Sequence, residues 1–256
     1  MLINARVALL FALVFGAGAA QANEGGHASW QREAENEVAN LASLQRGARN
    51  FMAYCSGCHS LKFVRYSRVC VDLSIAEDQC QALLVRPGDK AVDYIKAPMP
   101  AADATEWFGK APPDLSLVAR SRSPDWIFNF LTTFYADPAS RQTGVNNLQL
   151  PGTAMPHVLA SVQGVQNAVW DNVEHKGEDG KPVVTTAFKE FEPGVVGTLT
   201  PEQFDEFARD TVNFLQYVSD PTQLERQSLG IWVVLFLLMF TGIAYMLKAE
   251  YWKDVR

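Results

Sequence analysis

The amino-acid sequence predicts a mainly α-helical protein that is anchored in a membrane by one C-terminal helix. Three observations lead to this fold class: an apolar stripe at helical spacing before residue 55, a second stripe after residue 200, and an uncharged apolar run near the C-terminus. Hydrophobic residues make up 48% of the 256 residues and charged residues 20%, as in an ordinary globular protein. This composition argues against a disordered, collagen-like or polytopic membrane protein.

Residues 1–22 are predicted to be a secretory signal peptide. Arg6 precedes the uncharged run Val7 to Ala20, and Ala20-Gln21-Ala22 places small residues at the two positions that a signal peptidase recognises. The run is too short to cross a bilayer, and a buried N-terminal helix is the alternative. With cleavage after Ala22, the mature chain begins outside the cytoplasm.

Residues 23–225 are the predicted extracytoplasmic part, large enough for one well-buried domain with elaborations or for two small ones. Its 17 basic and 26 acidic side chains give a net charge of −9, compared with −6 for the whole chain. A nucleic acid is therefore not expected as a partner. A basic soluble partner would be attracted to this acidic part of the chain.

The helix predicted before residue 55, with Asn40 as a candidate N-cap, leads into a cysteine motif. Cys55-Ser56-Gly57-Cys58-His59 has the C-x-x-C-H pattern of covalent c-type haem attachment. Two thiols one helical turn apart can each form a thioether with a vinyl group of the same porphyrin, and the next imidazole then lies under the iron as the proximal ligand. The apolar face of the helix consists of Leu41, Leu44, Ala48, Phe51, Met52 and Cys55.

Two rival interpretations of this motif lack the sequence features that they require. A structural zinc site needs a second C-x-x-C or a pair of histidines at ribbon or finger spacing, and Cys70 and Cys80 are separated by nine intervening residues. A thioredoxin-like redox pair needs a surrounding βαβ pattern, whereas the flanking sequence is helical and then irregular.

Cys70 and Cys80 are the two cysteines left outside the C-x-x-C-H motif. They are expected to form a disulfide, because an oxidising compartment favours the pairing of cysteines that are present in even number. In the chain-entropy model, closing this 11-residue loop would add somewhat less than about 3 kcal/mol to the free energy of unfolding. Two free buried thiols are the alternative.

Three residues in proline-containing loops could supply the second axial ligand of the iron: Met99, Met155 and His157. A thioether on a stiff, irregular loop suits a low-spin electron-transfer haem, because methionine–histidine ligation raises the reduction potential. Residue chemistry alone favours Met155 over Met99 as the second iron ligand only slightly. His27, in the N-terminal tail, and His175, in a polar turn, are expected to be solvated.

From about Trp30 to the C-terminus the chain resembles the cytochrome c1 family through several motifs in a fixed order. They are Leu44-Gln45-Arg46-Gly47, Cys55-x-x-Cys58-His59-Ser60, Trp107 to Ser116 with Ala119-Arg120, Asp125 to Tyr135, Ala154-Met155-Pro156, and the single C-terminal anchor. The resemblance implies a class I type c-type cytochrome domain that is enlarged by long loops and a small β-hairpin and carries one covalent haem c. It also implies that Met155, rather than Met99, is the sixth iron ligand.

The same resemblance implies further residues beside the haem. Pro113 belongs to a segment similar to one that lines the haem crevice. Arg120 or Arg122 is similar to the partner of a haem propionate, since a guanidinium fork suits a carboxylate, and the choice between the two stays open. Trp126 stands where the family more often has a tyrosine near a propionate, so a hydrogen bond there would come from an indole N–H.

Local patterns predict three further elements and one region without regular structure. Thr200 to Gln203 has the form of a capping box that starts a helix ending at Ser219, and this helix is expected to cross the one before Cys55. Asp125 to Tyr135 is expected to be a third helix, and residues 167–192 a short β-hairpin around residues 176–181. Residues 70–111 are expected to be mostly loop.

Leu229 to Leu247 is an uncharged run of 19 residues, long enough to cross about 30 Å of hydrocarbon. The predicted transmembrane anchor is therefore residues 226–248, with a core helix of a large soluble protein as the alternative. Basic residues in the tail, residues 249–256, place the C-terminus in the cytoplasm by the positive-inside rule. The bulk of the chain would lie in the periplasm at a bacterial inner membrane.

The resemblance implies a one-electron carrier that is no enzyme on its own. It would pass electrons from the Rieske iron–sulfur protein to a soluble c-type cytochrome, beside cytochrome b, in a dimeric complex of the bacterial bc1 type. An anchored monohaem cytochrome that serves another oxidase or dehydrogenase is the nearest alternative. An exported thiol–disulfide oxidoreductase is the alternative from a different class.

Overall fold

The computed structural model describes residues 29–140, 143–176 and 182–254. The predicted signal peptide, residues 1–22, lies outside the described residues. Met1–Gln31 is a unit of its own, and Arg32–Arg256 is the second unit, which carries all the helices and strands described below.

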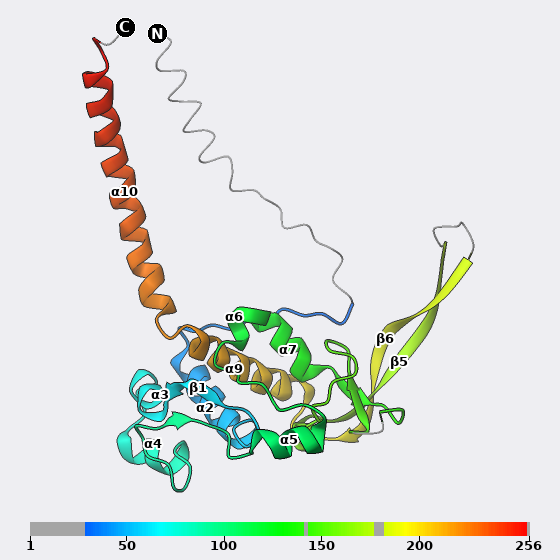
Figure 1. Cartoon of the computed structure of the whole chain (residues 1–256). Helices are drawn as coiled ribbons and strands as arrows, with labels where there is room; N and C mark the ends of the chain where they lie inside the picture. Colours follow the sequence, from blue (N-terminus) through cyan, green and yellow to red (C-terminus); the bar gives the residue numbers. More distant parts are fainter. Residues whose placement is uncertain (1–28, 141–142, 177–181, 255–256) are drawn as a thin grey trace. The chain divides into compact units, whose positions relative to one another are not determined.

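The second unit is mostly helical, as predicted, with small two-stranded sheets and a long apolar C-terminal helix (Figure 1). Its helices are α2 (Leu41–Tyr54), α3 (Tyr66–Asp72), α4 (Glu77–Leu83), α5 (Ala101–Phe108), α6 (Val118–Arg122), α7 (Pro124–Thr132), α8 (Ala160–Gln163), α9 (Pro201–Ser219) and α10 (Gln223–Tyr251). Its antiparallel strand pairs are β1 (Leu61–Arg65) with β2 (Tyr94–Ile95), β3 (Phe134–Ala136) with β4 (Val145–Asn147), and β5 (Gly164–Lys176) with β6 (Pro182–Val196).

Helices α2 and α9 cross at Gly47, which confirms the predicted crossing. A Cβ atom on Gly47 would lie 2.0 Å from the backbone oxygen of Asp210 and 2.7 Å from the Cβ of Phe214. The missing side chain therefore lets the two backbones approach closely. Beside the crossing, the guanidinium of Arg46 donates from Nε and Nη2 to both carboxylate oxygens of the buried Asp210. The aromatic rings of Phe51 and Phe214 pack 5.8 Å apart below it.

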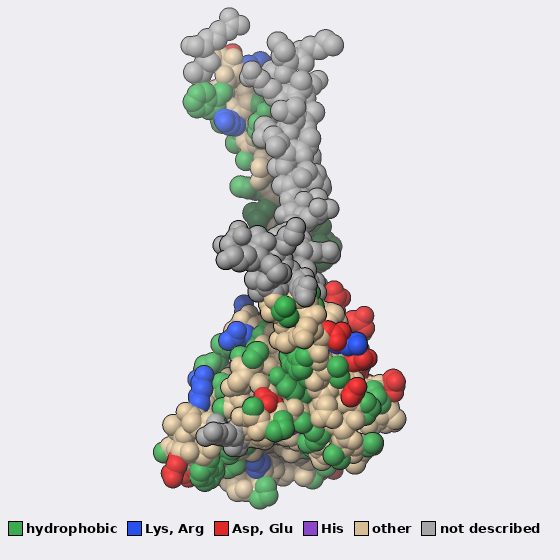
Figure 2. All heavy atoms as spheres, turned by 90° about the vertical axis from the view of Figure 1, so that its right-hand side faces the viewer, with side chains coloured by type: hydrophobic (Ala, Val, Ile, Leu, Met, Phe, Trp, Pro, Cys, Tyr) green, Lys and Arg blue, Asp and Glu red, His purple; other side chains and the backbone are tan. Residues whose placement is uncertain are grey.

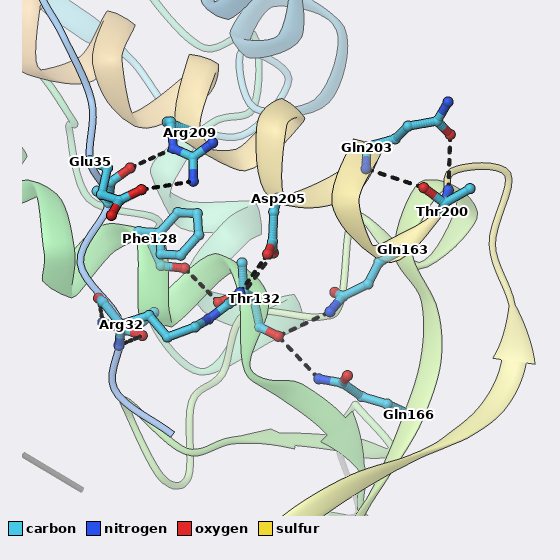
Figure 3. A network of polar contacts seen from close by, with 12 residues as sticks. Arg32, Glu35, Phe128, Thr132, Gln163, Gln166, Thr200, Gln203, Asp205 and Arg209 are labelled. Carbon is cyan, nitrogen blue, oxygen red and sulfur yellow. Dashed lines mark hydrogen bonds and ion pairs between the residues drawn. The ribbon is translucent and has the colours of Figure 1, made fainter. Parts of the chain in front are cut away.

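Both predicted helix caps are present. The side chain of Asn40 accepts a hydrogen bond from the backbone N–H of Ser43 at the start of α2. At the start of α9, the Thr200 hydroxyl accepts from the N–H of Gln203, and the Gln203 side chain accepts from the N–H of Thr200 (Figure 3). The single bond at Asn40 and the reciprocal pair at Thr200 fix the two N-termini from which the crossing helices run.

The segment before α2 ties α7 to α9. Arg32 pairs with Asp205 of α9 and lies 5.0 Å from the ring of Phe128 of α7 (Figure 3). Arg209 of α9 pairs with Glu35 and donates from Nε to the backbone oxygen of Ala34. These contacts hold α7 against the α2–α9 pair from outside.

One predicted boundary is wrong, and one region contains helices that were not predicted. More than half of residues 70–111 lie outside helices and strands, as expected, but α4, α5 and the end of α3 also lie there. These three helices lack a side-chain cap hydrogen bond, so no local signal marks their starts. The helix expected over Asp125 to Tyr135 ends at Thr132, because Phe134 to Ala136 pairs with β4. The predicted β-hairpin is confirmed and is longer than expected, since β5 and β6 are paired from Gly164 with Val196 to Lys176 with Pro182. Residues 177–181, which belong to its predicted turn, lie outside the described residues.

The predicted disulfide is present between Cys70 of α3 and Cys80 of α4, with 5.8 Å between the Cα atoms. Among the described residues, α10 is the one helix long and apolar enough to cross a membrane, with a mean hydropathy of 2.2 over its most apolar window and no buried residue in it. These properties suggest a single-pass membrane anchor.

Candidate functional site

The cysteine motif forms a tight turn directly after α2. The N–H of Cys55 donates to the oxygen of Phe51, which completes the helix. The oxygen of Cys55 then accepts from the N–H groups of Cys58, at 3.1 Å, and His59, at 2.9 Å. Both thiols are free and half-buried. Because one carbonyl binds the fourth and fifth residues of the motif, the turn holds the two thiols and the imidazole on one short stretch of backbone.

The imidazole of His59 is oriented by a backbone carbonyl. Its Nδ1 lies 2.8 Å from the oxygen of Pro113, and since a carbonyl can only accept, Nδ1 carries the proton. Burial lowers the pKa of His59, although the Pro113 bond and the Asp114 charge oppose this shift. At neutral pH the ring is therefore neutral, with the lone pair on Nε2. This is the form in which histidine binds a metal, with its other nitrogen held by an acceptor.

The segment that carries Pro113 is fastened to the chain after the motif. The N–H of Leu115 donates to the oxygen of Ser60 at 2.9 Å. The carboxylate of Asp114 accepts from the N–H of Lys62 at 2.8 Å and from that of Ser116 at 3.0 Å. Sequence reasoning assigned no role to Asp114, although an aspartate two residues before a serine is a signature of a local side-chain turn. Its bond to Lys62 ties the segment that carries Pro113 to the strand that follows His59.

The free thiols are unlike those of a redox enzyme. Burial, together with the nearby Cys58, raises the pKa of the Cys55 thiol to about 12. A reactive thiol–disulfide pair instead needs a thiolate with a lowered pKa. The local environment therefore disfavours the oxidoreductase interpretation.

Met155 lies half-buried on a loop that is organised by the two asparagines ending β4. Asn146 Oδ1 accepts from the N–H of Gly152 at 2.8 Å, and Gly152 has a φ of 73°, a conformation that favours glycine. The N–H of Met155 donates to the hydroxyl of Thr153 at 3.4 Å. The loop is thus shaped by side-chain contacts on the residues just before Met155. Met99 precedes the first residues of α5 and is also half-buried.

His157 is the third candidate ligand, apart from the two histidines that were expected to be solvated. The ring of His157 stacks on Phe134 at 5.0 Å, and its Nε2 lies 3.0 Å from the oxygen of Gly164. These two contacts fix the ring between β3 and the start of β5. His27 lies outside the described residues, and His175 belongs to β5.

The structure separates the two candidate arginines. The guanidinium of Arg122 lies 5.0 Å from the ring of Trp126, which itself stacks on Phe130 at 5.4 Å. Arg120 is exposed on the same short helix, α6. Its charge acts on Asp220, whose pKa is lowered chiefly by a hydrogen bond from Arg226. Arg122 and Trp126 are therefore neighbours, whereas Arg120 lies near the end of α9.

Comparison with known proteins yields one family. The sequence profile described as the Cytochrome C1 family matches residues 30–165 and 196–255. The unmatched stretch, residues 166–195, is the β5–β6 hairpin without the residues that begin β5 and end β6. The match therefore includes the turn after α2, the Pro113 segment, the Met155 loop and α10.

Three relatives illustrate the range of similar proteins. The chain is 45% identical over 219 residues to "Cytochrome c1" of Allochromatium vinosum, with 86% of this chain and 87% of the relative covered. It is 41% identical over 217 residues to "Ammonia monooxygenase gamma subunit" of Nitrosomonas europaea, with 85% of each covered. It is 27% identical over 244 residues to "Cytochrome b/c1" of Bradyrhizobium diazoefficiens, where 83% of this chain covers 33% of the relative.

Proposed function

Because this chain belongs to the cytochrome c1 family, we propose that it is the membrane-anchored one-electron carrier of a bacterial cytochrome bc1 complex. The observation that carries the proposal is the turn after α2, where two free thiols precede an imidazole whose Nδ1 is held by the Pro113 oxygen. Family membership implies a covalent haem c, and this donor set fits that group.

We assign five residues to the attachment of one haem c. Cys55 and Cys58 would form the two thioethers, and Nε2 of His59 and the sulfur of Met155 would bind the iron. Pro113 holds the His59 ring in the orientation described above. The bound haem supplies a one-electron couple between ferric and ferrous iron.

The other assigned residues are those expected to contact a haem propionate. Arg122, with Trp126 beside it, provides a guanidinium and an indole N–H for a haem propionate, and Arg120 is the second candidate for this role. A neutral imidazole and a thioether bring no charge to the iron, and the protein needs no acid, base or nucleophile for electron transfer. The chain therefore acts as a carrier within a larger enzyme.

The proposed partners are cytochrome b and the Rieske iron–sulfur protein in a dimeric complex, with a soluble c-type cytochrome as acceptor. A relative whose name joins cytochrome b to c1 in one chain supports the first partner. We further propose that residues 1–22 are removed on export and that residues 23–225 lie in the periplasm. Residues 226–248 would then cross the inner membrane, and residues 249–256 would lie in the cytoplasm, consistent with the apolar surface of α10.

A second candidate function is supported by one relative. The 41% identity to a protein named as a subunit of ammonia monooxygenase favours an anchored monohaem cytochrome that serves a different oxidising enzyme. The same residues would hold the haem in both cases, and the partners would differ.

Purification through a tag on the C-terminal tail distinguishes the two candidates. The detergent-solubilised complex from the native membrane is expected to contain cytochrome b and the Rieske protein, identified by mass spectrometry, and to reduce cytochrome c with quinol. Copurification of monooxygenase subunits without cytochrome b would favour the second candidate.

The proposed iron ligand is tested by a matched pair of variants. Met155→Leu is expected to abolish the sulfur-to-iron charge-transfer band and to lower the reduction potential, because a thioether ligand raises it. Met99→Leu, on the loop before α5, should leave both unchanged. An unaltered spectrum for Met155→Leu would move the ligand assignment to another residue.

A further inference from the structure

The basic side chains of this acidic chain fall into two groups. Several arginines pair with carboxylates: Arg32 with Asp205, Arg46 with Asp210, Arg68 with Asp72, Arg209 with Glu35 and Arg226 with Asp220. Others, such as Arg49 on α2 and Arg122 on α6, have no carboxylate within ion-pair distance among the described residues. No carboxylate in the described part of the chain lies within ion-pair distance of Lys62, Arg65 or Lys96. These three cations belong to β1 and to the residue after β2.

Exposed aromatic rings lie between these cations. Phe63 and Tyr94 are 60% and 40% exposed. The Lys62 ammonium lies 5.0 Å from the Phe63 ring, and the Arg65 guanidinium lies 4.6 Å from the Tyr94 ring. Lys62, Phe63, Arg65, Tyr94 and Lys96 are together called the β1–β2 patch. Aromatic rings and arginines are the side chains most enriched where protein interfaces are strongest.

An open pocket of about 390 Å³ adjoins the patch, lined by Arg65, Arg86, Asp89, Val92, Asp93, Tyr94 and Lys96. The two carboxylates in it are already engaged. Asp89 binds Arg86 and the Tyr66 hydroxyl, and Asp93 accepts from the N–H of Lys90. Arg65 donates to the backbone oxygen of Val92 and to the Tyr94 hydroxyl, which are neutral groups. The positive charges of Arg65 and Lys96 therefore have no carboxylate partner in the described chain.

The patch is joined directly to the proposed haem site. β1 begins two residues after His59, and the N–H of Lys62 is bound by Asp114, the residue after Pro113. A protein seated on the patch would thus contact the segment that carries the proposed iron ligand. Acidic side chains are concentrated on α9 and on the segment before α2. On the face drawn in Figure 2, most acidic groups lie on the right flank and most basic groups on the left flank, with some groups of the opposite sign on both.

We propose that the β1–β2 patch docks an acidic face of the soluble electron acceptor. The inference rests on the proposed function, and it reverses the expectation from the net charge, which favours a basic partner. Net charge describes attraction at long range, whereas the unpaired cations beside the site determine which surface is complementary on contact. Docking would also cover the exposed rings of Phe63 and Tyr94.

Charge reversal in the patch, compared with an equal change outside it, tests the proposal. The test variant is Lys62→Glu with Lys96→Glu, and the control is Arg49→Glu on α2 with Lys189→Glu on β6, where the exposed ion pair of Lys189 with Asp171 contributes little to stability. All four side chains are exposed, and the side chains of Lys62 and Lys96 donate no hydrogen bond described above. The probes are two haem proteins, the acidic soluble domain of cytochrome b5 and the basic mitochondrial cytochrome c. Their equilibrium binding to the full-length holoprotein in detergent is measured at low and high ionic strength.

The test variant should bind the acidic probe at least about tenfold more weakly at low ionic strength, and the control less than about twofold more weakly. Added salt should reduce the difference. Equal losses in both variants, or no loss in the test variant, would overturn the proposal. If charge reversal lowers the melting temperature, Lys62→Gln with Lys96→Gln replaces it and should show about half the effect on the logarithm of affinity.

The outcome is separable from that of the proposed function. Binding is measured without electron transfer, and a haem-stained denaturing gel of the same preparation reports whether the haem is attached. A haem-containing protein whose patch variants bind normally would refute the patch alone. A preparation without covalent haem would refute the proposed function.

Discussion

The α2–α9 crossing and the β5–β6 hairpin are stabilised by different kinds of contact. At the crossing, Gly47 brings two backbones into contact, and Phe51 and Phe214 are fully buried around it. Along the hairpin, large side chains such as Trp170 and Val184 remain exposed. The family profile matches the crossing and omits residues 166–195. Tertiary packing thus holds the part that positions the haem motif, whereas local strand pairing holds the added part.

The hairpin is fastened to the domain at its base only, as far as the described contacts show. Gln163 and Gln166 both donate to the oxygen of Thr132 at the end of α7 (Figure 3). Gln166 also donates to the oxygen of Phe134, and the ring of Trp170 meets Tyr135 edge-on at 6.0 Å. A long hairpin with so few supports contributes little to the stability of the domain.

The largest effect is expected at the crossing. Gly47→Ala places a methyl group 2.0 Å from a backbone oxygen of α9, so the helices must separate. We expect a loss of more than about 3 kcal/mol in the free energy of unfolding, with a reduced yield of haem-containing protein. Denaturant unfolding measures it. Gly57→Ala, within the cysteine motif but with no atom within 4 Å of the new methyl, is the control and should be neutral.

A smaller loss is expected when the ion pair beside the crossing is broken. Asp210 is buried, so Asp210→Asn leaves Arg46 without its carboxylate, and we expect a cost of about 2 kcal/mol because Arg46 stays partly exposed. Asp205→Asn breaks the more exposed pair with Arg32 and should cost less than about 1 kcal/mol. Equal losses of stability for Asp210→Asn and Asp205→Asn in thermal unfolding would show that burial of the carboxylate does not strengthen the ion pair at the crossing.

Shortening the hairpin should change the stability of the domain less than either of the changes at the crossing. Replacing residues 169–190 with Asn-Gly joins the paired residues Ala168 and Phe191 by a two-residue turn and keeps the Gln166 contacts. The visible spectrum should be unchanged, and the free energy of unfolding should shift by no more than about 1 kcal/mol. A loss comparable to that of Gly47→Ala would remove the distinction between the two regions.

The smallest effect concerns pH at the end of α9. The Arg226 hydrogen bond lowers the pKa of Asp220 from its ordinary value, so its contribution to stability is present above that value. It is lost as the pH falls through the lowered pKa in the folded state. We expect less than about 1 kcal/mol, because Arg226 is exposed. Asp220→Asn should flatten this part of the stability profile, measured by thermal unfolding from pH 6 downward; an unchanged profile would contradict the assignment.

Local signals predicted the elements that carry the site. Asn40 and Thr200 mark the starts of the crossing helices, and the spacing of apolar residues marks their faces. The missed features depend on residues far apart in the sequence: α7 ends early because Phe134 pairs with Asn147, and Asp114 holds Lys62 across 52 positions. Sequence spacing gave no means of separating Arg120 from Arg122, whose neighbours come from different helices.

That the turn after α2 carries one covalent haem is tested most directly by the intact mass of the purified chain under denaturing conditions. The proposed function predicts a mass equal to that of the chain from Asn23 plus one haem, and loss of the added mass when Cys55 and Cys58 are both replaced by alanine. A wild-type mass equal to that of the bare polypeptide, with both thiols free to react, would contradict it.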